Sequence, residues 1–165
     1  MKIDAKVQSI SKLKDYFFLV PDYQREYVWK PDDEVEQFLI DIENEYSPDA
    51  KEQRNYFLGS IIIVNNDRCF DVVDGQQRLT TIMLSLCVFR DLLKKETLNS
   101  AQKNYLQIIE NLLYNFDIES GETRVRLELQ YEESHDYLTA LIQEQPYNGC
   151  LLYTSPSPRD YAASR

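Results

Sequence analysis

The sequence predicts an α+β fold, in which helices pack on a small mixed sheet. Short apolar runs of strand length occur between longer segments whose apolar residues recur with the period of a helix. Clusters of turn-forming residues separate these segments. The 165 residues are enough for one domain with a sizeable core.

The first part of the chain predicts a short helix, a strand and an amphipathic helix. Residues 7–13 carry the apolar positions of a short helix, and the apolar strand Phe17–Val20 ends at Pro21. Residues 32–46 predict a clear helix, with a proline and an acidic run at its positive N-terminal end. Its apolar residues share one face; they are Val35, Phe38, Leu39, Ile42 and Tyr46.

The middle of the chain predicts a hairpin that leads into a long helix. The continuous apolar run Tyr56–Val64 is typical of a central strand covered on both faces. The residues at 65–67, Asn-Asn-Asp, connect it to a second strand, Arg68–Val73. After a turn at Gly75, a long helix places these residues inward: Leu79, Ile82, Met83, Leu86 and Leu93.

The last part predicts two helices around a short strand. A helix over about 100–115 has an apolar face made of Tyr105, Ile108, Ile109, Leu112 and Phe116. A Ser-Gly turn then leads to the alternating strand Arg124–Leu129, and a helix over about 132–144 ends before Pro146. Because these two helices carry apolar faces, we expect an exposed patch for further protein around Ile108, Leu112, Leu138 or Leu141.

The end of the chain differs from the rest in its composition and residue pattern. Residues 150–160, CLLYTSPSPRD, follow neither period and resemble one translated frame of a sequencing adapter. The alternative is a genuine Ser/Pro-rich linker. We therefore divide the chain into a core at 1–95, a truncated helical extension at 96–149 and an adapter-derived tail at 150–165, which should lie extended without contacts.

The composition excludes several kinds of site. Eighteen Lys and Arg against 28 Asp and Glu give a net charge of −10, which leaves no broad basic face for wrapping DNA. One histidine, His135, excludes HNH-type nuclease centres, His-rich metal sites and His-based triads in this chain. The cysteines, Cys69, Cys87 and Cys150, form no CxxC pair and suggest reduced thiols in the cytoplasm. No apolar run is long enough to span a membrane. Any site for phosphates must therefore be small and local.

The stretch VVDGQQRLTT carries the strongest functional signal. It predicts a strand end, a tight turn at Gly75 and the first turn of a helix, where Arg78 is unfavourable unless an anion shares the site. Backbone N–H groups after the glycine would bind such an anion, and Arg78 would grip a phosphate. Gln76 and Gln77 would donate to phosphate oxygens or orient a water. Asp74 would hold a Mg²⁺ ion that bridges phosphates.

A purely structural interpretation of this stretch stays open, since the phosphate loops GxxxxGK[ST] and GxGxxG are absent. In that interpretation Asp74 is an N-cap, Gly75 a turn residue and Arg78 a surface partner for a carboxylate.

A second element, Tyr23-Gln24-Arg25, follows the stiff Pro21. Arg25 is a second candidate for binding the anion. The aromatic residues Tyr23, Tyr27 and Trp29 either stack a base or pack the core. We interpret Cys69, Cys87 and His135 as ordinary packing or surface residues.

Three segments together resemble a known family. FLVPDYQREYVW, YFLGSIII and VVDGQQRLTTIMLSL, in that order and spacing, are similar to the "domain of unknown function 262" family. That family is the N-terminal domain of GmrSD-type restriction proteins, within the ParB/sulfiredoxin-like superfamily. The resemblance covers roughly residues 7–95 and implies a ParB-like, nucleotide-binding core. The site residues that it implies are Asp74, Gly75, Gln76, Gln77 and Arg78, faced by Tyr23, Gln24 and Arg25.

The resemblance also implies a function. The turn would bind NTP phosphates with Mg²⁺ and support hydrolysis, in prokaryotic defence against phage with modified DNA. DNA would be cut by an HNH-type nuclease domain or subunit missing from this fragment. The oligomeric state, a homo-oligomer included, is left open. A non-hydrolysing nucleotide switch or DNA-modification sensor is the alternative, because it would use the same pocket. Nuclease chemistry within this domain is weakly supported, since no acidic cluster with a Lys or His base stands out. We expect the loop at 21–29 to fold over the turn at 74–78, so that Arg25 and Arg78 share one phosphate.

Overall fold

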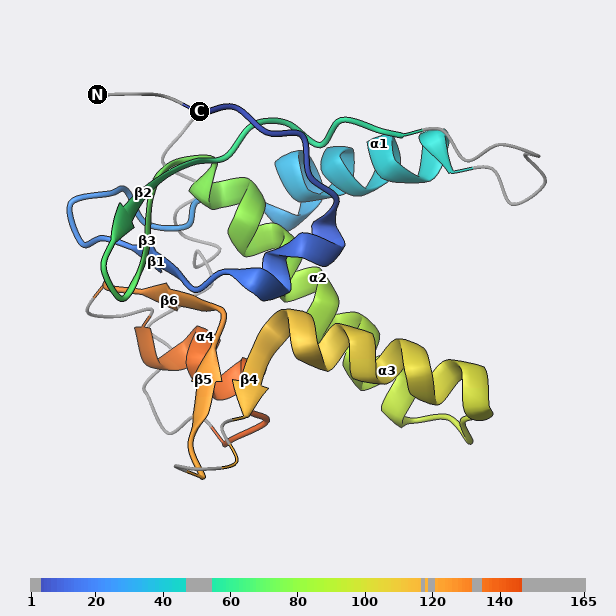
Figure 1. Cartoon of the computed structure of the whole chain (residues 1–165). Helices are drawn as coiled ribbons and strands as arrows, with labels where there is room; N and C mark the ends of the chain where they lie inside the picture. Colours follow the sequence, from blue (N-terminus) through green and yellow to red (C-terminus); the bar gives the residue numbers. More distant parts are fainter. Residues whose placement is uncertain (1–3, 47–54, 117, 119–120, 132–134, 147–165) are drawn as a thin grey trace, which may run out of the picture.

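The main sheet has four strands in the order β2–β3–β1–β6 and is mixed (Figure 1). β1 (Phe18–Val20) lies between β3 (Cys69–Asp74) and β6 (Leu127–Leu129) and runs parallel to both. β2 (Ile62–Asn66) forms an antiparallel hairpin with β3. The computed structural model describes residues 4–46, 55–116, 118, 121–131 and 135–146.

Helices pack against this sheet, which confirms the α+β prediction. α2 (Gln76–Lys94) follows β3 directly after Gly75, and α3 (Ser100–Leu113) packs beside it (Figure 1). α4 (His135–Ile142) contacts both α2 and β6. No helix in the described part of the chain is long and apolar enough to cross a membrane.

Two helical segments flank the first strand. A 3-10 helix at Ile10–Asp15 precedes β1, where the sequence predicts a short helix. A π-helical turn at Pro31–Val35 leads into α1 (Glu36–Glu45), which confirms the helix predicted over 32–46. No residue of α1 is fully buried, but Phe38 and Ile42 are half-buried and Phe38 packs against Trp29, so the described residues cover the predicted apolar face in part.

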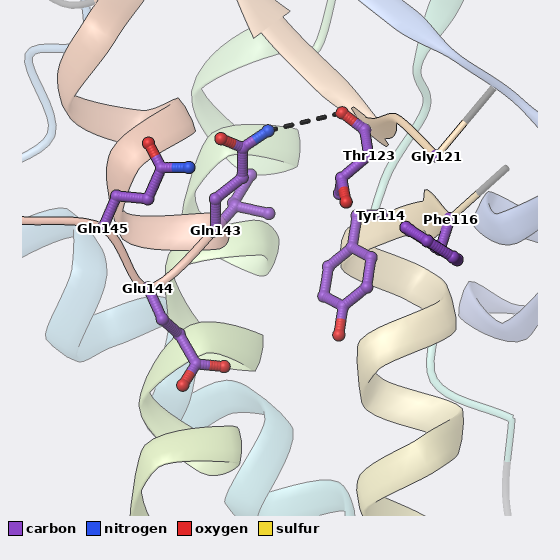
Figure 2. A pocket seen from close by; sticks show the side chains of 8 residues that line it. Tyr114, Phe116, Gly121, Thr123, Gln143, Glu144 and Gln145 are labelled. Carbon is purple, nitrogen blue, oxygen red and sulfur yellow. Dashed lines mark hydrogen bonds between the residues drawn. The ribbon is translucent and has the colours of Figure 1, made fainter. Parts of the chain in front are cut away.

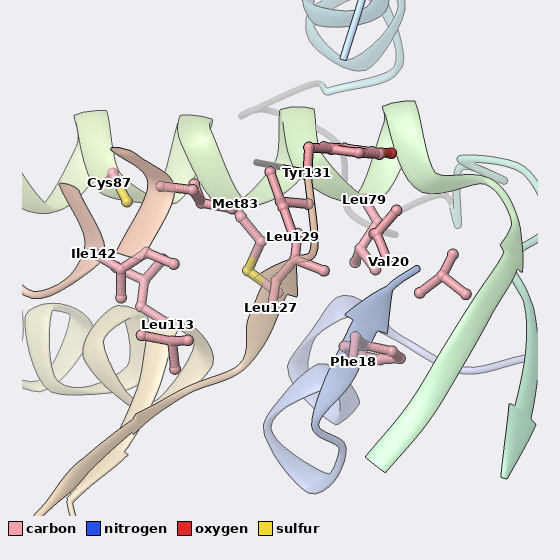
Figure 3. Packing of buried hydrophobic residues seen from close by; sticks show 13 residues of the cluster. Phe18, Val20, Leu79, Met83, Cys87, Leu113, Leu127, Leu129, Tyr131 and Ile142 are labelled. Carbon is pink, nitrogen blue, oxygen red and sulfur yellow. The ribbon is translucent and has the colours of Figure 1, made fainter. Parts of the chain in front are cut away.

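The hydrophobic core lies between α2 and the sheet (Figure 3). Leu79, Met83 and Cys87 share one face of α2, because successive members are four residues apart, and all three are buried. Val20 and Leu127, from the neighbouring strands β1 and β6, have no exposed surface. The strands thus supply one wall of the core and α2 the other.

This core continues across position 95, where the sequence suggests the end of the core segment. β6 pairs with β1 residue by residue, with Phe18 opposite Leu127 and Val20 opposite Leu129. Ile142 of α4 is fully buried in the same cluster. The segment after position 95 therefore supplies a sheet strand and core side chains in addition to helices.

A buried arginine fastens α4 to α2. The Arg90 side chain is 1% exposed, and its guanidinium donates to the carbonyl oxygens of Leu141 (3.0 Å) and Ile142 (2.6 Å) at the end of α4. Its Nε lies 2.9 Å from an Asp91 oxygen and 3.5 Å from a Glu144 oxygen. Because a buried charge is costly unless it is paired, this arrangement defines how α4 docks.

The prediction of a central strand over Tyr56–Val64 is wrong. β2 begins only at Ile62 and lies at the edge of the sheet, where its residues are exposed except for the half-buried Ile63. The reason is topological: β1 already occupies the other side of β3, so the hairpin leaves β2 outside. An apolar run shows that a segment avoids water, but it does not show where in a sheet the segment pairs.

The strand predicted over Arg124–Leu129 is two strands. β5 (Thr123–Val125) pairs with β4 (Tyr114–Phe116) in a separate two-stranded ribbon, whereas β6 joins the main sheet. Arg126 lies between them and bonds through its backbone to Leu113 on one side and to Phe18 on the other.

The predicted apolar patch is only partly present. Leu112 and Leu138 are buried, so the prediction is wrong for them, and Leu141 is half-buried. Ile108 is exposed as predicted. Leu138 turns inward because it belongs to the common core cluster. The tail at 150–165 lies outside the described residues.

Candidate functional site

The predicted strand–turn–helix junction is present at the end of β3. Asp74 ends the strand, Gly75 adopts φ +85°, and α2 begins at Gln76. A Cβ on Gly75 would lie 2.7 Å from the carbonyl oxygen of Ser60, so neither the backbone angle nor the space permits a side chain. The first helical backbone bond runs from the N–H of Leu79 to Gly75, which leaves the preceding N–H groups of the helix end without helical acceptors.

The N-cap interpretation of Asp74 is wrong. Gly75 occupies the N-cap position, and no side chain caps α2. The Asp74 carboxylate forms no hydrogen bond or ion pair with the described residues, and it is exposed at the mouth of the junction. It is therefore available to a ligand.

The loop at residues 21–29, called the Arg25 loop below, is bound to this junction as the sequence predicts. Buried Gln77 uses both ends of its amide for this contact. Its Nε2 donates to the carbonyl oxygen of Glu26 at 2.8 Å, and its Oε1 accepts from the backbone N–H of Val28 at 2.8 Å. Gln77 thus completes the backbone hydrogen bonding of the loop much as a partner strand would.

Gln76 holds the same loop one residue earlier, with the help of a residue far along the chain. Its Nε2 donates to the carbonyl oxygen of Arg25 at 2.8 Å. The hydroxyl of Tyr131, just after β6, lies 2.8 Å from Gln76 Oε1 and 2.5 Å from the same Arg25 oxygen. Sequence reasoning missed Tyr131, because it belongs to no motif and reaches the site only through the pairing of β6 with β1.

Two further contacts seat the Arg25 loop. Gln24 Nε2 donates to the carbonyl oxygen of Val73 at 3.2 Å. The hydroxyl groups of Tyr27 and Thr81 are 2.9 Å apart and share a hydrogen bond. The loop is therefore attached both to the end of β3 and to the second turn of α2.

The aromatic residues of the loop have different surroundings. Trp29 packs against Phe38, with ring centroids 5.9 Å apart, and Tyr27 is half-buried through its contact with α2. Tyr23 is 72% exposed. Packing therefore accounts for Trp29 and Tyr27, whereas Tyr23 keeps a free ring face.

Arg78 lies in a seat made by the segment before β2. Its Nη1 donates to the carbonyl oxygen of Ser60 at 3.0 Å. A Cβ on Gly59 would lie 2.6 Å from the Arg78 Cζ, so the missing side chain makes the room for the guanidinium. Gly59 also has φ +109°, a conformation that suits only glycine. Gly59 and Ser60 belong to the YFLGSIII segment, for which sequence reasoning found no role beyond the family resemblance.

Neither candidate arginine has a carboxylate partner. Arg25 and Arg78 form no ion pair with any carboxylate of the described residues, which contradicts the interpretation of Arg78 as a partner for a surface acid. Buried Arg90, by contrast, is paired with two acids. The Arg25 side chain is exposed, while its backbone is bound to Gln76. Sharing of one phosphate by the two guanidinium groups stays a prediction.

A family model described as the GmrSD restriction endonuclease N-terminal domain matches residues 7–160. The chain belongs to this family. No curated protein sequence matches the chain significantly. The match extends well beyond residues 7–95, in agreement with a core that includes β6 and α4. It also runs through residues 150–160, and their origin in an adapter stays a prediction.

In this GmrSD N-terminal domain, the junction offers one carboxylate for a metal ion. The described residues contain no group of three or more His, Cys, Asp or Glu side chains arranged to hold a metal. Mg²⁺ in nucleotide sites is usually held by one or two carboxylates together with the phosphates and waters. Asp74 alone therefore fits an ion that arrives with a nucleotide, and it does not fit a metal ion bound by protein ligands alone.

A hollow among the described residues lies far from this junction. Figure 2 shows it beside β4, β5 and the end of α4, with a volume of about 560 Å³, between Tyr114, Thr123 and Gln143 among others. It lies near the Arg90 end of α2, and Arg90 is 14 residues beyond Gln76 on that helix, or about 20 Å at the helical rise. The hollow is not part of the predicted site.

Burial raises the pKa of the Tyr131, Cys87 and Cys69 side chains. It raises the pKa of the Tyr131 hydroxyl, assisted by the nearby Glu26 charge, so the hydroxyl remains a donor at neutral pH. Burial also raises the pKa of the Cys87 thiol to about 11 and raises the pKa of Cys69. Both thiols are therefore protonated at neutral pH, in agreement with packing roles.

Proposed function

We propose that this domain binds the phosphates of a nucleoside triphosphate at the 74–78 junction and supports their hydrolysis, as the N-terminal module of a GmrSD-like, modification-dependent restriction system. The observation that carries the proposal is that Arg25 and Arg78 have no acidic partner among the described residues, in a chain of net charge −10. Arg78 lies at the start of α2, and the backbone of Arg25 is bound to the neighbouring Gln76. DNA cleavage would belong to an HNH-type nuclease domain or subunit of the complete system.

Each part of the junction has a role in this proposal. The free N–H groups at the start of α2 would bind phosphate oxygens, and Arg78 would add a charge-assisted grip from its seat at Gly59 and Ser60. Arg25 and Arg78 would neutralise charge on the transferred phosphoryl group, which is the dominant contribution in such chemistry. Asp74 would hold a Mg²⁺ that neutralises the phosphates when it is bound. Tyr23 would stack on the base with its exposed ring.

A specific observation favours a second candidate, a nucleotide switch or DNA-modification sensor without hydrolysis. Hydrolysis requires a group that orients the attacking water, and Gln76 or Gln77 is the candidate. Both ends of each amide are occupied by the Arg25 loop and Tyr131. Either a glutamine leaves the loop during turnover, or the site binds nucleotide and transmits its presence through the loop.

The decisive experiment compares binding and turnover. Binding of the fluorescent analogues mant-GTP and mant-ATP is titrated with Mg²⁺ and with EDTA, and phosphate release is measured on the full-length protein. We expect Arg78→Ala and Arg25→Ala to abolish binding. Arg68→Ala is the matched control, since it removes the same charge from the exposed hairpin. Unchanged binding in Arg78→Ala would refute the phosphate site, and tight binding without phosphate release would favour the switch.

A further inference from the structure

Tyr131 has a contact pattern that its packing does not require. Its ring belongs to the core cluster and is only 6% exposed, and a phenylalanine ring would fill the same space. Its hydroxyl instead reaches Arg25 and Gln76, which lie 106 and 55 residues earlier in the chain. The hydroxyl therefore joins three segments: the Arg25 loop, the start of α2 and the end of β6.

The three groups form a triangle of close polar contacts, of which two are hydrogen bonds at any one time, because both contacts of the hydroxyl need its single proton. Gln76 Nε2 donates to the Arg25 carbonyl oxygen at 2.8 Å, and the Tyr131 hydroxyl faces that oxygen at 2.5 Å and Gln76 Oε1 at 2.8 Å. The hydroxyl has one proton for two acceptors, so it can donate either to the Arg25 carbonyl oxygen or to Gln76 Oε1. Without it, the buried Gln76 Oε1 has no donor among the described residues, and the carbonyl depends on Gln76 alone.

We propose that Tyr131 is a positioning residue of the phosphate site: its hydroxyl fixes the backbone of Arg25 against Gln76, and thereby sets the point beside the junction from which the Arg25 side chain extends. This inference rests on the proposed nucleotide site and assigns to it a residue outside all the sequence motifs. Tyr131 acts through Arg25 and Gln76, and it makes no contact with the nucleotide itself. The second half of the chain thereby controls the affinity of a site whose motifs all lie in the first half.

The test uses Tyr131→Phe in the 165-residue chain, which removes the hydroxyl and keeps the ring. Tyr16→Phe is the matched control, because it also deletes one hydroxyl hydrogen bond, to Gln8, away from the junction. With mant-GTP and Mg²⁺, we expect Tyr131→Phe to raise Kd by about three- to tenfold, as expected for one lost hydrogen bond. Amide exchange over residues 22–28 should become faster, whereas Tyr16→Phe should change neither Kd nor amide exchange in this loop.

The outcomes separate this inference from the proposed function. If the wild type binds mant-GTP, Arg78→Ala does not, and Tyr131→Phe binds with the affinity of the wild type, the positioning role is refuted and the phosphate site stands. If the wild type does not bind, the proposed function and this inference both fail. A purely structural role for the hydroxyl would lower the unfolding midpoint without changing Kd or exchange in the loop, and that result would also overturn the inference.

Discussion

Replacing Gly59 by alanine tests whether the seat of Arg78 matters for binding. A Cβ at this position would lie 2.6 Å from Arg78 Cζ, 2.8 Å from Nη1 and 2.9 Å from Nε. Ordinary contact begins at 3.4 Å, so the guanidinium has to retreat by about 0.8 Å or swing away from Ser60. Because the clash involves the end of a flexible side chain, Arg78 is displaced and the domain still folds.

The expected magnitude follows from the geometry of that displacement. Charge-assisted hydrogen bonds contribute about 1.5–3 kcal/mol, so the loss of the grip of Arg78 should weaken mant-GTP binding about tenfold to a hundredfold. Because an alanine is strained at the φ of +109°, the substitution should also lower the unfolding free energy by roughly 1–2 kcal/mol. Isothermal titration of the nucleotide and urea denaturation measure the two effects separately.

Gly121→Ala provides the matched control. Gly121 also has a positive φ, +72°, but a Cβ there meets nothing within 4 Å. Gly121→Ala should therefore lower stability and leave nucleotide affinity unchanged. If Gly59→Ala binds mant-GTP as tightly as Gly121→Ala does, the displacement of Arg78 has no consequence and the reasoning about its seat is refuted.

Three other predictions concern the loop, the helix joint and a buried thiol. Gln77→Ala removes both side-chain hydrogen bonds to the Arg25 loop. Hydrogen exchange of the Val28 backbone amide, measured by nuclear magnetic resonance, should therefore accelerate about tenfold to a hundredfold. An unchanged rate would show that Gln77 does not hold the loop. Arg90→Met roughly keeps the side-chain volume but deprives the carbonyl oxygens of Leu141 and Ile142 of a charged donor. It should lower the unfolding free energy measured in urea by about 2–4 kcal/mol. A loss near zero would show that Arg90 does not hold α4 on α2. The Cys87 thiol should react with a disulfide reagent more slowly than Cys69, because it is buried and its pKa is about 11. Since the unfolded thiol, with a pKa of 9.0, releases its proton at lower pH than the folded one, stability should fall as pH rises from 9 to about 11, and this part of the fall should be absent in Cys87→Ala.

Local patterns in the sequence predict the junction well. The positive φ of Gly75 and the helical spacing of Leu79 and Met83 depend on residues close together in the chain, and both are present. The family resemblance places the Arg25 loop beside the junction, and Gln77 confirms this contact with two hydrogen bonds. That Arg25 and Arg78 take no carboxylate partner among the described residues is shown by the structure and not by the sequence.

The partners of the glutamines could not be predicted. An amide group suits a phosphate oxygen, a water or a peptide carbonyl equally well, and only the fold shows that Gln76 and Gln77 bind backbone. The roles of Gly59 and Tyr131 depend on contacts between distant segments, which no local period encodes. The edge position of β2 has the same origin, because strand order is decided by the whole sheet.

The position of β1 has a consequence for synthesis of the protein. This central strand is made early, yet its partner β6 begins 107 residues after β1 ends, from Val20 to Leu127. At the usual elongation rate the ribosome needs about 5–20 s to cover that distance, during which one edge of β1 has no native neighbour. Open strand edges invite pairing with other chains, so slow translation or premature termination in this interval favours aggregation. A product that stops after Leu86 but before Leu127 retains every sequence motif of the junction, but it lacks both the closing strand and Tyr131.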